Sequence, residues 1–527
     1  MKGRAAWLLA AALLACALVR LPLLARQGLW VDEVFSLAIA TGHSLEHPAA
    51  EADPALGDFV EGASARPASA WRAYLQHDDP PAGPARVLRA VLLSDTSPPL
   101  YYLGLWAWTR VLGTSDAALR GFSLLCALAC LPFLVRLASW AGGKRAVLPA
   151  CFLFAFAPLS IYYGTEGRMY ALLWLCVLVH AWSTVVLRAR GLRTGPALAW
   201  VAASACGFLT HYFFVFPWGA LTLLFLLRSG RTARWTILAG GVLTLLVALP
   251  WYTHLGESLA RWRVTRGWLE WKPDGFQRVP EARELFLLYF SGSEKNQWGE
   301  HRLARGASLA LFALLGALFF WRLRARAFAA RRLDLWCWLA AAWAGPLVFD
   351  AACGTYTVAV SRYALAGMPA ALLLAAVALG SLGPRLRYGM LAGLMVAWVP
   401  HLELLGRMDS RSWCPLREVA WAAERSQSDQ DLVLVHSIPS GMLGVARYYR
   451  GESVLAPWVE QLEERKLPES LLALARGKER VHLVRVHEVG ALCPAEDWLR
   501  AHAVLNAETR IMSANVRHFR PRDGAVF

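Results

Sequence analysis

The run LAGMPAALLLAAVALGSL at residues 365–382 contains no charged side chain. About 20 apolar residues in a helix cross the roughly 30 Å of hydrocarbon in a bilayer, and this run approaches that length. Residues 5–24 and 306–321 form similar stretches, and the whole chain is 57% hydrophobic and 17% charged, with a mean hydropathy of +0.38. Soluble proteins rarely have this composition. The sequence therefore predicts a polytopic membrane protein.

Hydropathy predicts about eleven spanning helices. They are expected at residues 5–25, 117–139, 147–163, 169–188, 196–212, 213–228, 232–254, 306–321, 334–352, 361–381 and 388–405. The first resembles a signal peptide in its basic start, but its apolar core is long and no convincing cleavage site follows it. We interpret it as the first span.

Basic residues predict the orientation of these spans. The net charge of +16 could suggest nucleic-acid binding, but the basic residues form short clusters between apolar runs rather than one polar face. The clusters lie near residues 2–4, 144–145, 188–193, 228–234, 322–332 and 385–387. Because positively charged loops stay cytoplasmic, eleven spans with a cytoplasmic N-terminus place every cluster inside. We expect a plasma (inner) membrane protein that binds no nucleic acid.

Three polar regions then lie on the outer side, at residues 26–116, 255–305 and from 406 onward. Within the first, the apolar piece 98–112 is too short to span and contains Arg110, which favours a re-entrant or interfacial helix. The last region alternates strand-like runs at 432–436 and 481–486 with helical patterns at 416–426 and 469–475. The predicted fold is an all-α membrane domain over residues 1–405 and an extracytoplasmic α/β domain over 406–527.

The ten cysteines do not indicate a zinc site. Cys126 and Cys130 form one close pair, inside a predicted span that contains no other metal-binding side chain. Cys414 and Cys493 fall in the polar C-terminal region, where a disulfide between them requires that the region is exported.

Four polar clusters at the outer side are the candidates for chemistry, because ionisable groups near a membrane are costly to hold. The first is GLWVDEVFS at residues 28–36, where Asp32 and Glu33 sit among apolar side chains. Such surroundings raise a carboxylate's pKa and suit it to act as a base. The alternative is an ordinary solvated helix cap.

The other clusters are DTSPPLYY at 95–102, YYGTEGRMY at 162–170 and SRY at 361–363. Each has a structural alternative: Asp95 as a helix cap, Glu166 and Arg168 as a structural ion pair, and Arg362 as an interfacial anchor. Otherwise Arg362 could bind a lipid phosphate through its planar fork. The candidate donor- or acceptor-binding residues are Asp95, Tyr101, Tyr102, Tyr163, Glu166, Arg168, Tyr170, Arg362 and Tyr363. His211 and His254, near outer helix ends, are interpreted as helix-end or packing residues.

In their order and spacing these motifs, together with LRGFS at 119–123, resemble the GT-C glycosyltransferase superfamily. The closest resemblance is to protein O-mannosyltransferases and lipid A aminoarabinose transferases, and it is strongest over residues 25–190. It implies that Asp32 is the general base for the acceptor hydroxyl or amine, with Glu33 beside it. Asp95 would be a second acid in the first outer loop. Relatives of the aminoarabinose type have Glu-Lys where this chain has Thr96-Ser97.

The resemblance also implies the substrates. The donor would be a sugar on polyprenyl phosphate, and the acceptor a lipid, glycan or protein, with whole-oligosaccharide transfer or polymer ligation as variants. Oligosaccharide-transferring relatives keep a metal-binding acidic motif where this chain has only Glu166, so we expect no cofactor and no metal. If a metal were needed, Glu166 and Asp32 would bind it. The alternatives are a transporter or flippase for lipid-linked saccharides and a non-catalytic membrane scaffold.

Overall fold

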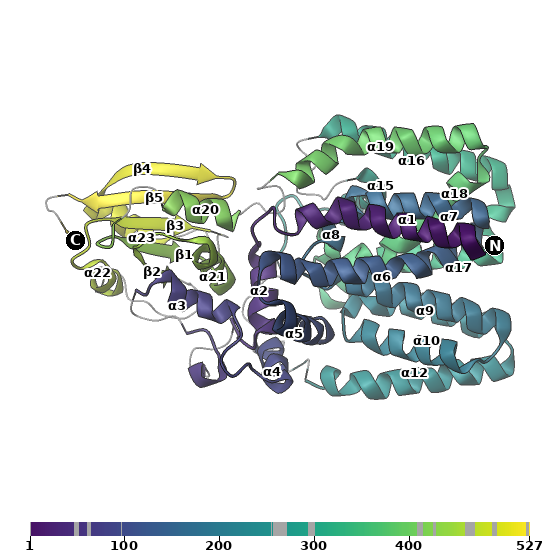
Figure 1. The fold of residues 1–527 in the computed structure, drawn as a ribbon, viewed down its shortest axis with the longest axis horizontal. Helices are drawn as coiled ribbons and strands as arrows, with labels where there is room; N and C mark the ends of the chain where they lie inside the picture. The colour runs from purple at the N-terminus through teal and green to yellow at the C-terminus, as the bar shows by residue number, and fades with distance from the viewer. Residues whose placement is uncertain are drawn as a thin grey trace.

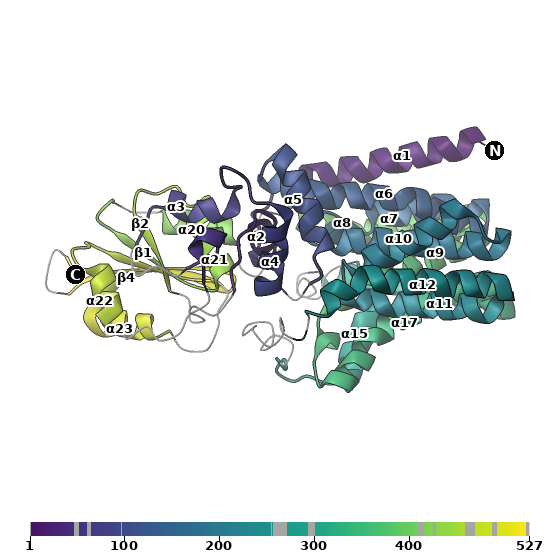
Figure 2. The same cartoon turned by 90° about the horizontal axis from the view of Figure 1, so that it is seen from below.

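The computed structural model describes residues 2–46, 52–60, 65–95, 97–254, 256, 271–292, 301–407, 415–424, 428–458, 469–486, 493–522 and 526–527. A bundle of long helices forms one end of the molecule and a sheet with its own helices forms the other (Figure 1). The chain begins at the far end of the bundle and finishes at the far end of the sheet. Helices of the first outer region lie between these two parts (Figure 2).

Eight helices in the described part of the chain are long and apolar enough to cross a membrane. They are α1 (Lys2–Arg20), α6 (Asp116–Gly142), α9 (Tyr170–Arg190), α12 (Arg231–Tyr252), α16 (Arg302–Leu323), α17 (Ala330–Cys353), η9 with α18 (Ser361–Gly367 and Met368–Ser381) and α19 (Pro384–Gly406). In the apolar window of the α18 span 94% of the residues are buried, which places this helix inside the bundle. These helices confirm an integral membrane protein.

The remaining predicted spans differ from straight crossings. The span predicted at 147–163 is a pair, α7 (Lys144–Phe156) and α8 (Pro158–Gly164), bent by 59°. Pro158 has no N–H to continue the helix, and the buried Arg20 guanidinium instead binds the freed carbonyls of Phe154 and Ala155, each at 2.9 Å. Arg20 therefore stabilises the break between α7 and α8 by supplying the hydrogen bonds that these backbone carbonyls lose.

Two predicted spans, at 196–212 and 213–228, correspond to shorter helices. These are α10 (Thr194–Phe208) and α11 (Val215–Arg228), joined through the 3₁₀ turn η5 (Tyr212–Phe214). With the bent pair counted as one, nine segments in the described ranges have spanning length and composition. The predicted number of eleven is not reached by this measure, because the chain turns at residues 209–214 before α10 reaches full length.

Basic residues at several helix ends meet at Asp334, in the first turn and a half of α17. Arg188, from the end of α9, and Arg228, from the end of α11, both bind its carboxylate. These ion pairs bring the basic connections at 188–193, 228–234 and 322–332 together at one end of the bundle. The side of the membrane on which that end lies stays a prediction.

The first outer region forms α2 (Val31–Ala40), α3 (Ala68–Arg72), α4 (Pro84–Ser94) and α5 (Leu100–Leu112). The helix α5 follows a Pro-Pro pair and ends at Gly113, whose φ of +77° an L side chain rarely adopts. Its 13 residues are too short to cross, as predicted. In the second outer region the structure describes α15 (Arg278–Ser291), which packs beside α16 and α17.

The C-terminal part is a five-stranded sheet in the order β2-β1-β3-β5-β4, which confirms the predicted α/β region. The strands are β1 (Leu432–His436), β2 (Val454–Trp458), β3 (Val481–Arg485), β4 (Ala503–Ile511) and β5 (Ala514–Pro521); the first three are parallel and β5 is antiparallel to both β3 and β4. Alternate residues of β1 belong to different cores, since Leu432 and Leu434 join one cluster and Val433 and Val435 another.

Those two cores explain how the sheet sits on the bundle. One face packs on α22 (Glu469–Ala475) and α23 (Pro494–His502), whose Leu471 and Leu499 lie in the sheet's own cluster. The other face is covered by α20 (Leu416–Ala423) and α21 (Pro439–Tyr448), whose apolar residues continue into the core of the bundle. The helix α21 contacts both α2 and α3. Through α21, the C-terminal domain therefore packs against α2, the helix on which Asp32 and Glu33 lie. The sequence left a disulfide between Cys414 and Cys493 possible, and Cys414 lies outside the described residues.

Candidate active site

The four polar clusters predicted from the sequence converge on one place, around the start of α2. Asp32 of the first cluster binds Arg362 of the fourth. Glu33 binds the backbone of Gly167 in the third, and Arg168 of that cluster binds Asp95 of the second. Segments up to 330 residues apart in the chain therefore form a single network.

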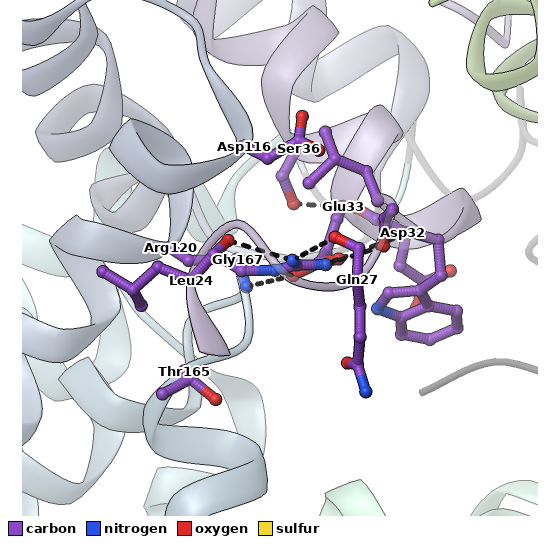
Figure 3. A network of polar contacts seen from close by, with 12 residues as sticks. Leu24, Gln27, Asp32, Glu33, Ser36, Asp116, Arg120, Thr165 and Gly167 are labelled. Atoms are coloured by element: carbon purple, nitrogen blue, oxygen red, sulfur yellow. Dashed lines mark hydrogen bonds and ion pairs between the residues drawn. The ribbon is translucent and has the colours of Figure 1, made fainter. Parts of the chain in front are cut away.

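Glu33 and Arg120 form the buried centre of this network (Figure 3). Arg120 Nε donates to Glu33 Oε1 at 2.8 Å and Nη2 donates to Oε2 at 2.5 Å, and both side chains are fully buried. Glu33 also accepts the amide of Gly167 at 2.7 Å and that of Trp30 at 3.3 Å. The carboxylate thus has four hydrogen-bond donors around it, which stabilise its charged form.

Arg120 also binds the chain that leads into α2. Its Nη1 donates to the carbonyls of Leu24 and Gln27 at 3.1 and 2.7 Å, and Nη2 donates to that of Gly28 at 2.8 Å. The pair consequently joins the end of α1, the start of α2, α6 and the connection between α8 and α9. Glu33 was predicted to lie beside the base, and its contacts are those of a positioning residue.

Asp32 is placed differently from its neighbour. Its carboxylate is about a quarter exposed, and Oδ2 accepts a hydrogen bond from Arg362 Nη1 at 2.6 Å. Across the described residues, Oδ1 has no hydrogen-bond partner. One oxygen is therefore oriented by a guanidinium while the other is open to a substrate.

Asp95 lies in a second, buried group with Tyr102 and Arg168. Its Oδ1 accepts the amide of Ser97 at 2.9 Å, and Oδ2 accepts the Tyr102 hydroxyl and Arg168 Nη1. Asp95 therefore does cap the turn before α5, which was its structural alternative, while it also fixes Arg168. Burial, with the adjacent Asp95 also contributing, raises the pKa of the Tyr102 phenol, so the hydroxyl keeps its proton and serves as a donor.

Arg168 does not form the structural pair with Glu166 that was the alternative interpretation of that cluster. Its Nη1 instead lies 3.1 Å from Ser36 Oγ, 3.0 Å from Tyr102 Oη and 3.3 Å from Asp95 Oδ2. Glu166 is buried in the connection between α8 and α9, with its backbone carbonyl accepting the Arg168 amide at 2.7 Å. The Nη1 of Arg168 thus belongs to the group around Asp95.

Aromatic side chains line the same region. The rings of Tyr163 and Tyr170 lie 5.1 Å apart, and His211 lies 6.3 Å from Tyr170 and 6.2 Å from Tyr363. Tyr101 is further back, fully buried, with its hydroxyl 3.5 Å from Ser123 Oγ. The fold therefore brings Tyr163, Tyr170 and Tyr363 together. Tyr101 is not part of this group and packs against Tyr102 and Phe122 instead.

Two residues of this region were not among the predicted site residues. Arg120 was quoted only within LRGFS, although a charge inside an otherwise apolar span is itself a signal. Glu46 was not singled out from the sequence, yet burial, with the charges of Asp95 and Asp32 acting in the same direction, raises its pKa to about 8. Glu46 is thus a further carboxyl group close to Asp32 and Asp95.

The described residues contain no group of three or more His, Cys, Asp or Glu side chains placed to hold a metal ion. Asp32 and Glu166 were named as the ligands of a metal if one is needed. Among the described residues, no third His, Cys, Asp or Glu side chain completes a site with them. Whether the chemistry needs a metal stays a prediction.

No family model matches the chain, and no curated protein sequence matches it. Solved structures do. ArnT from Cupriavidus metallidurans bound to undecaprenyl phosphate aligns with a TM-score of 0.59 and 14% identity over 98% of each chain. Its apo state aligns with a TM-score of 0.55 and 14% identity, over 92% of this chain and 95% of that one. The archaeal oligosaccharyltransferase AglB from Archaeoglobus fulgidus gives 0.44 and 11% identity, over 92% and 69%.

The similarity to ArnT covers both the bundle and the C-terminal sheet. At this identity it shows the fold alone: the chain folds like ArnT over nearly its whole length.

Proposed function

We propose that the chain is a membrane glycosyltransferase that moves a sugar from a polyprenyl-phosphate donor to an acceptor hydroxyl or amine. The observation that carries the proposal is the difference between the two adjacent carboxylates. Glu33 is saturated by hydrogen bonds, whereas Asp32 keeps Oδ1 without a partner among the described side chains and backbone groups. The GT-C fold, shared with a protein crystallised with undecaprenyl phosphate, supports the choice of donor.

In the proposed reaction Asp32 Oδ1 removes the proton from the acceptor as its oxygen or nitrogen attacks the anomeric carbon. The bond between that carbon and the phosphate oxygen breaks, and the phosphate leaves with the electron pair. A single displacement of this kind inverts the anomeric configuration. Arg362 holds the other oxygen of Asp32 at 2.6 Å, so it fixes the direction in which the base faces.

The charge that develops on the leaving phosphate needs cations nearby. Arg362 and Arg168 each lie beside a carboxylate of the network, whereas Arg120 uses its N–H groups on Glu33 and on backbone carbonyls. A planar guanidinium with several N–H groups suits phosphate oxygens. These two residues are therefore the proposed phosphate-stabilising groups, which matters because the Lys of the aminoarabinose-type relatives is absent from positions 96–97.

The proposal includes an orientation. The donor's tail would lie in the bilayer, with α5 as one wall of its entry, and the acceptor would arrive from the side of the sheet domain. We propose that this side is extracytoplasmic and that the N-terminus is cytoplasmic, since the basic helix ends gather at the opposite end around Asp334. Lipid, glycan and protein acceptors are all compatible with an open Asp32.

The test uses purified protein in nanodiscs with polyprenyl-phosphate-linked sugars and candidate acceptors, following sugar transfer by mass spectrometry. Asp32→Asn removes the base while keeping the hydrogen bond acceptor for Arg362, so transfer should fall by at least about 100-fold. Asp497→Asn makes the same change at an exposed position of the sheet domain and should leave transfer unchanged. Donor binding without turnover, unaffected by Asp32→Asn, would instead favour a transporter or a scaffold.

A further inference from the structure

His211 lies between α10 and η5, in the turn that replaces the predicted long span. Only 7% of its surface is exposed, and its ring contacts Tyr170, Phe213 and Tyr363 at centroid distances of 6.3, 5.8 and 6.2 Å. The sequence alone suggested a helix-end or packing residue. A helix-end role explains the hydrogen bond of one ring nitrogen, Nδ1, but gives no role to the other, Nε2.

The first nitrogen has a structural task. Nδ1 accepts the backbone amide of Phe213 at 3.2 Å and so caps η5. A nitrogen that accepts a hydrogen bond carries no proton, so in the neutral ring the proton is on Nε2. Burial, together with the charges of Arg168 and Arg362, lowers the pKa of the ring to about 3, so the neutral form holds at physiological pH.

The second nitrogen is a donor without an acceptor. Within the described ranges, Nε2 has no hydrogen-bond partner, and it is not among the unpaired nitrogens that are sealed from solvent. The charged groups that affect the ring after burial are Arg168, Arg362 and Asp95. Guanidinium groups cannot accept a hydrogen bond, and the Asp95 oxygens bind Ser97, Tyr102 and Arg168 instead. A donor in a nearly buried position that the protein leaves unpaired is a place for a ligand oxygen.

We propose that His211 is a specificity-determining residue whose Nε2–H donates a hydrogen bond to a hydroxyl oxygen of the donor's sugar. The inference rests on the proposed glycosyltransferase function. A sugar hydroxyl is favoured over a phosphate oxygen for two reasons. The ring is neutral and lies among aromatic rings, whose faces suit the apolar faces of a sugar, whereas a phosphate already has Arg168 and Arg362.

The experiment separates the two nitrogens with two variants. His211→Asn places an amide oxygen near the position of Nδ1, so the cap on η5 remains, but nothing reaches the position of Nε2. His211→Gln places an amide N–H near Nε2 but gives up the cap. His254→Asn is the matched control, since His254 is exposed after the end of α12. All are compared in the full-length protein in nanodiscs for thermal unfolding, for transfer, and for binding of free polyprenyl phosphate.

If His211 binds the sugar, His211→Asn unfolds at the wild-type temperature and binds free polyprenyl phosphate normally. Its kcat/KM for transfer should fall about 5- to 10-fold, the loss of one neutral hydrogen bond. His211→Gln should keep more transfer activity than His211→Asn although it unfolds at a lower temperature. The control should match the wild type in all three measurements.

Three results overturn the inference. Full transfer by His211→Asn together with a loss of stability in His211→Gln would make His211 a cap only. Weaker binding of free polyprenyl phosphate by His211→Asn would place the contact at the phosphate. Greater transfer by His211→Asn than by His211→Gln would contradict the assignment of the proton to Nε2. An absence of transfer by the wild type is a separate result, which contradicts the proposed function itself.

Discussion

The Tyr448 hydroxyl donates a hydrogen bond to Asp116 Oδ2 at 2.7 Å and accepts one from the Leu29 amide at 2.6 Å. Arg417 and Arg447, which like Tyr448 belong to the sheet domain, bind the same carboxylate. Asp116 lies one helical turn before Arg120 on α6, and Leu29 lies just before α2. The C-terminal domain is therefore bound directly to the segment that carries Asp32.

Tyr448→Phe should lower both stability and turnover. It leaves the buried Leu29 amide without its acceptor, which costs about 1–3 kcal/mol, and it loosens the segment that leads to Asp32. Thermal unfolding and kcat should both fall. The control is Tyr449→Phe, the same change at the next residue, which is buried within the C-terminal domain. If kcat stays at the wild-type value in Tyr448→Phe, the C-terminal domain does not position the site.

Arg120→Ala should be strongly destabilising. It leaves the Glu33 carboxylate buried without its cation, and breaking such a pair costs about 3–5 kcal/mol. Arg283→Ala is the comparison, because Arg283 is largely exposed and its pair with Glu284 contributes at most about 1 kcal/mol. Thermal unfolding in one detergent measures both. Equal losses in the two variants would contradict the assignment of Arg120 as the centre of the network.

Arg362→Ala should reduce transfer, and the reduction should be smaller in a protein that already carries Asp32→Asn. The two side chains form one unit through the 2.6 Å hydrogen bond, so their effects should not add. Because Arg362 is also proposed to stabilise the leaving phosphate, we expect the double variant to be slower than Asp32→Asn alone, but by a smaller factor than Arg362→Ala slows the wild type. Rates measured for the two single variants and the double variant decide this. Fully multiplicative losses would show that Arg362 acts independently of Asp32.

Glu46 predicts a dependence of stability on pH. Its pKa is raised from an ordinary value of 4.5 to about 8, so the folded protein holds a proton that the unfolded chain releases. That contribution to stability is fully present below pH 4.5 and is lost as the pH rises toward 8. The unfolding temperature of the wild type should therefore fall relative to Glu46→Gln across this window. Parallel curves for the two proteins would contradict the raised pKa.

Some features follow from local sequence. Hydropathy identified the long helices because the cost of exposing polar groups to lipid acts on each run of residues separately. Strand-like runs identified β1 and β3, and the limited length of the apolar piece 98–112, with Arg110 inside it, predicted the short α5. The four polar clusters were also found from sequence, because charge is conspicuous near apolar runs.

The roles of those clusters depended on the tertiary structure. The sequence places Asp32 and Glu33 side by side with the same chemistry, and only the packing of α6, 87 residues away, gives Glu33 the Arg120 partner that Asp32 lacks. Likewise, Arg362 reaches Asp32 across 330 residues, and the turn around His211 ends a helix that hydropathy alone extends. Hydropathy and periodicity are sums over neighbouring residues, whereas a side chain's partners are set by which distant segments the folded chain brings together.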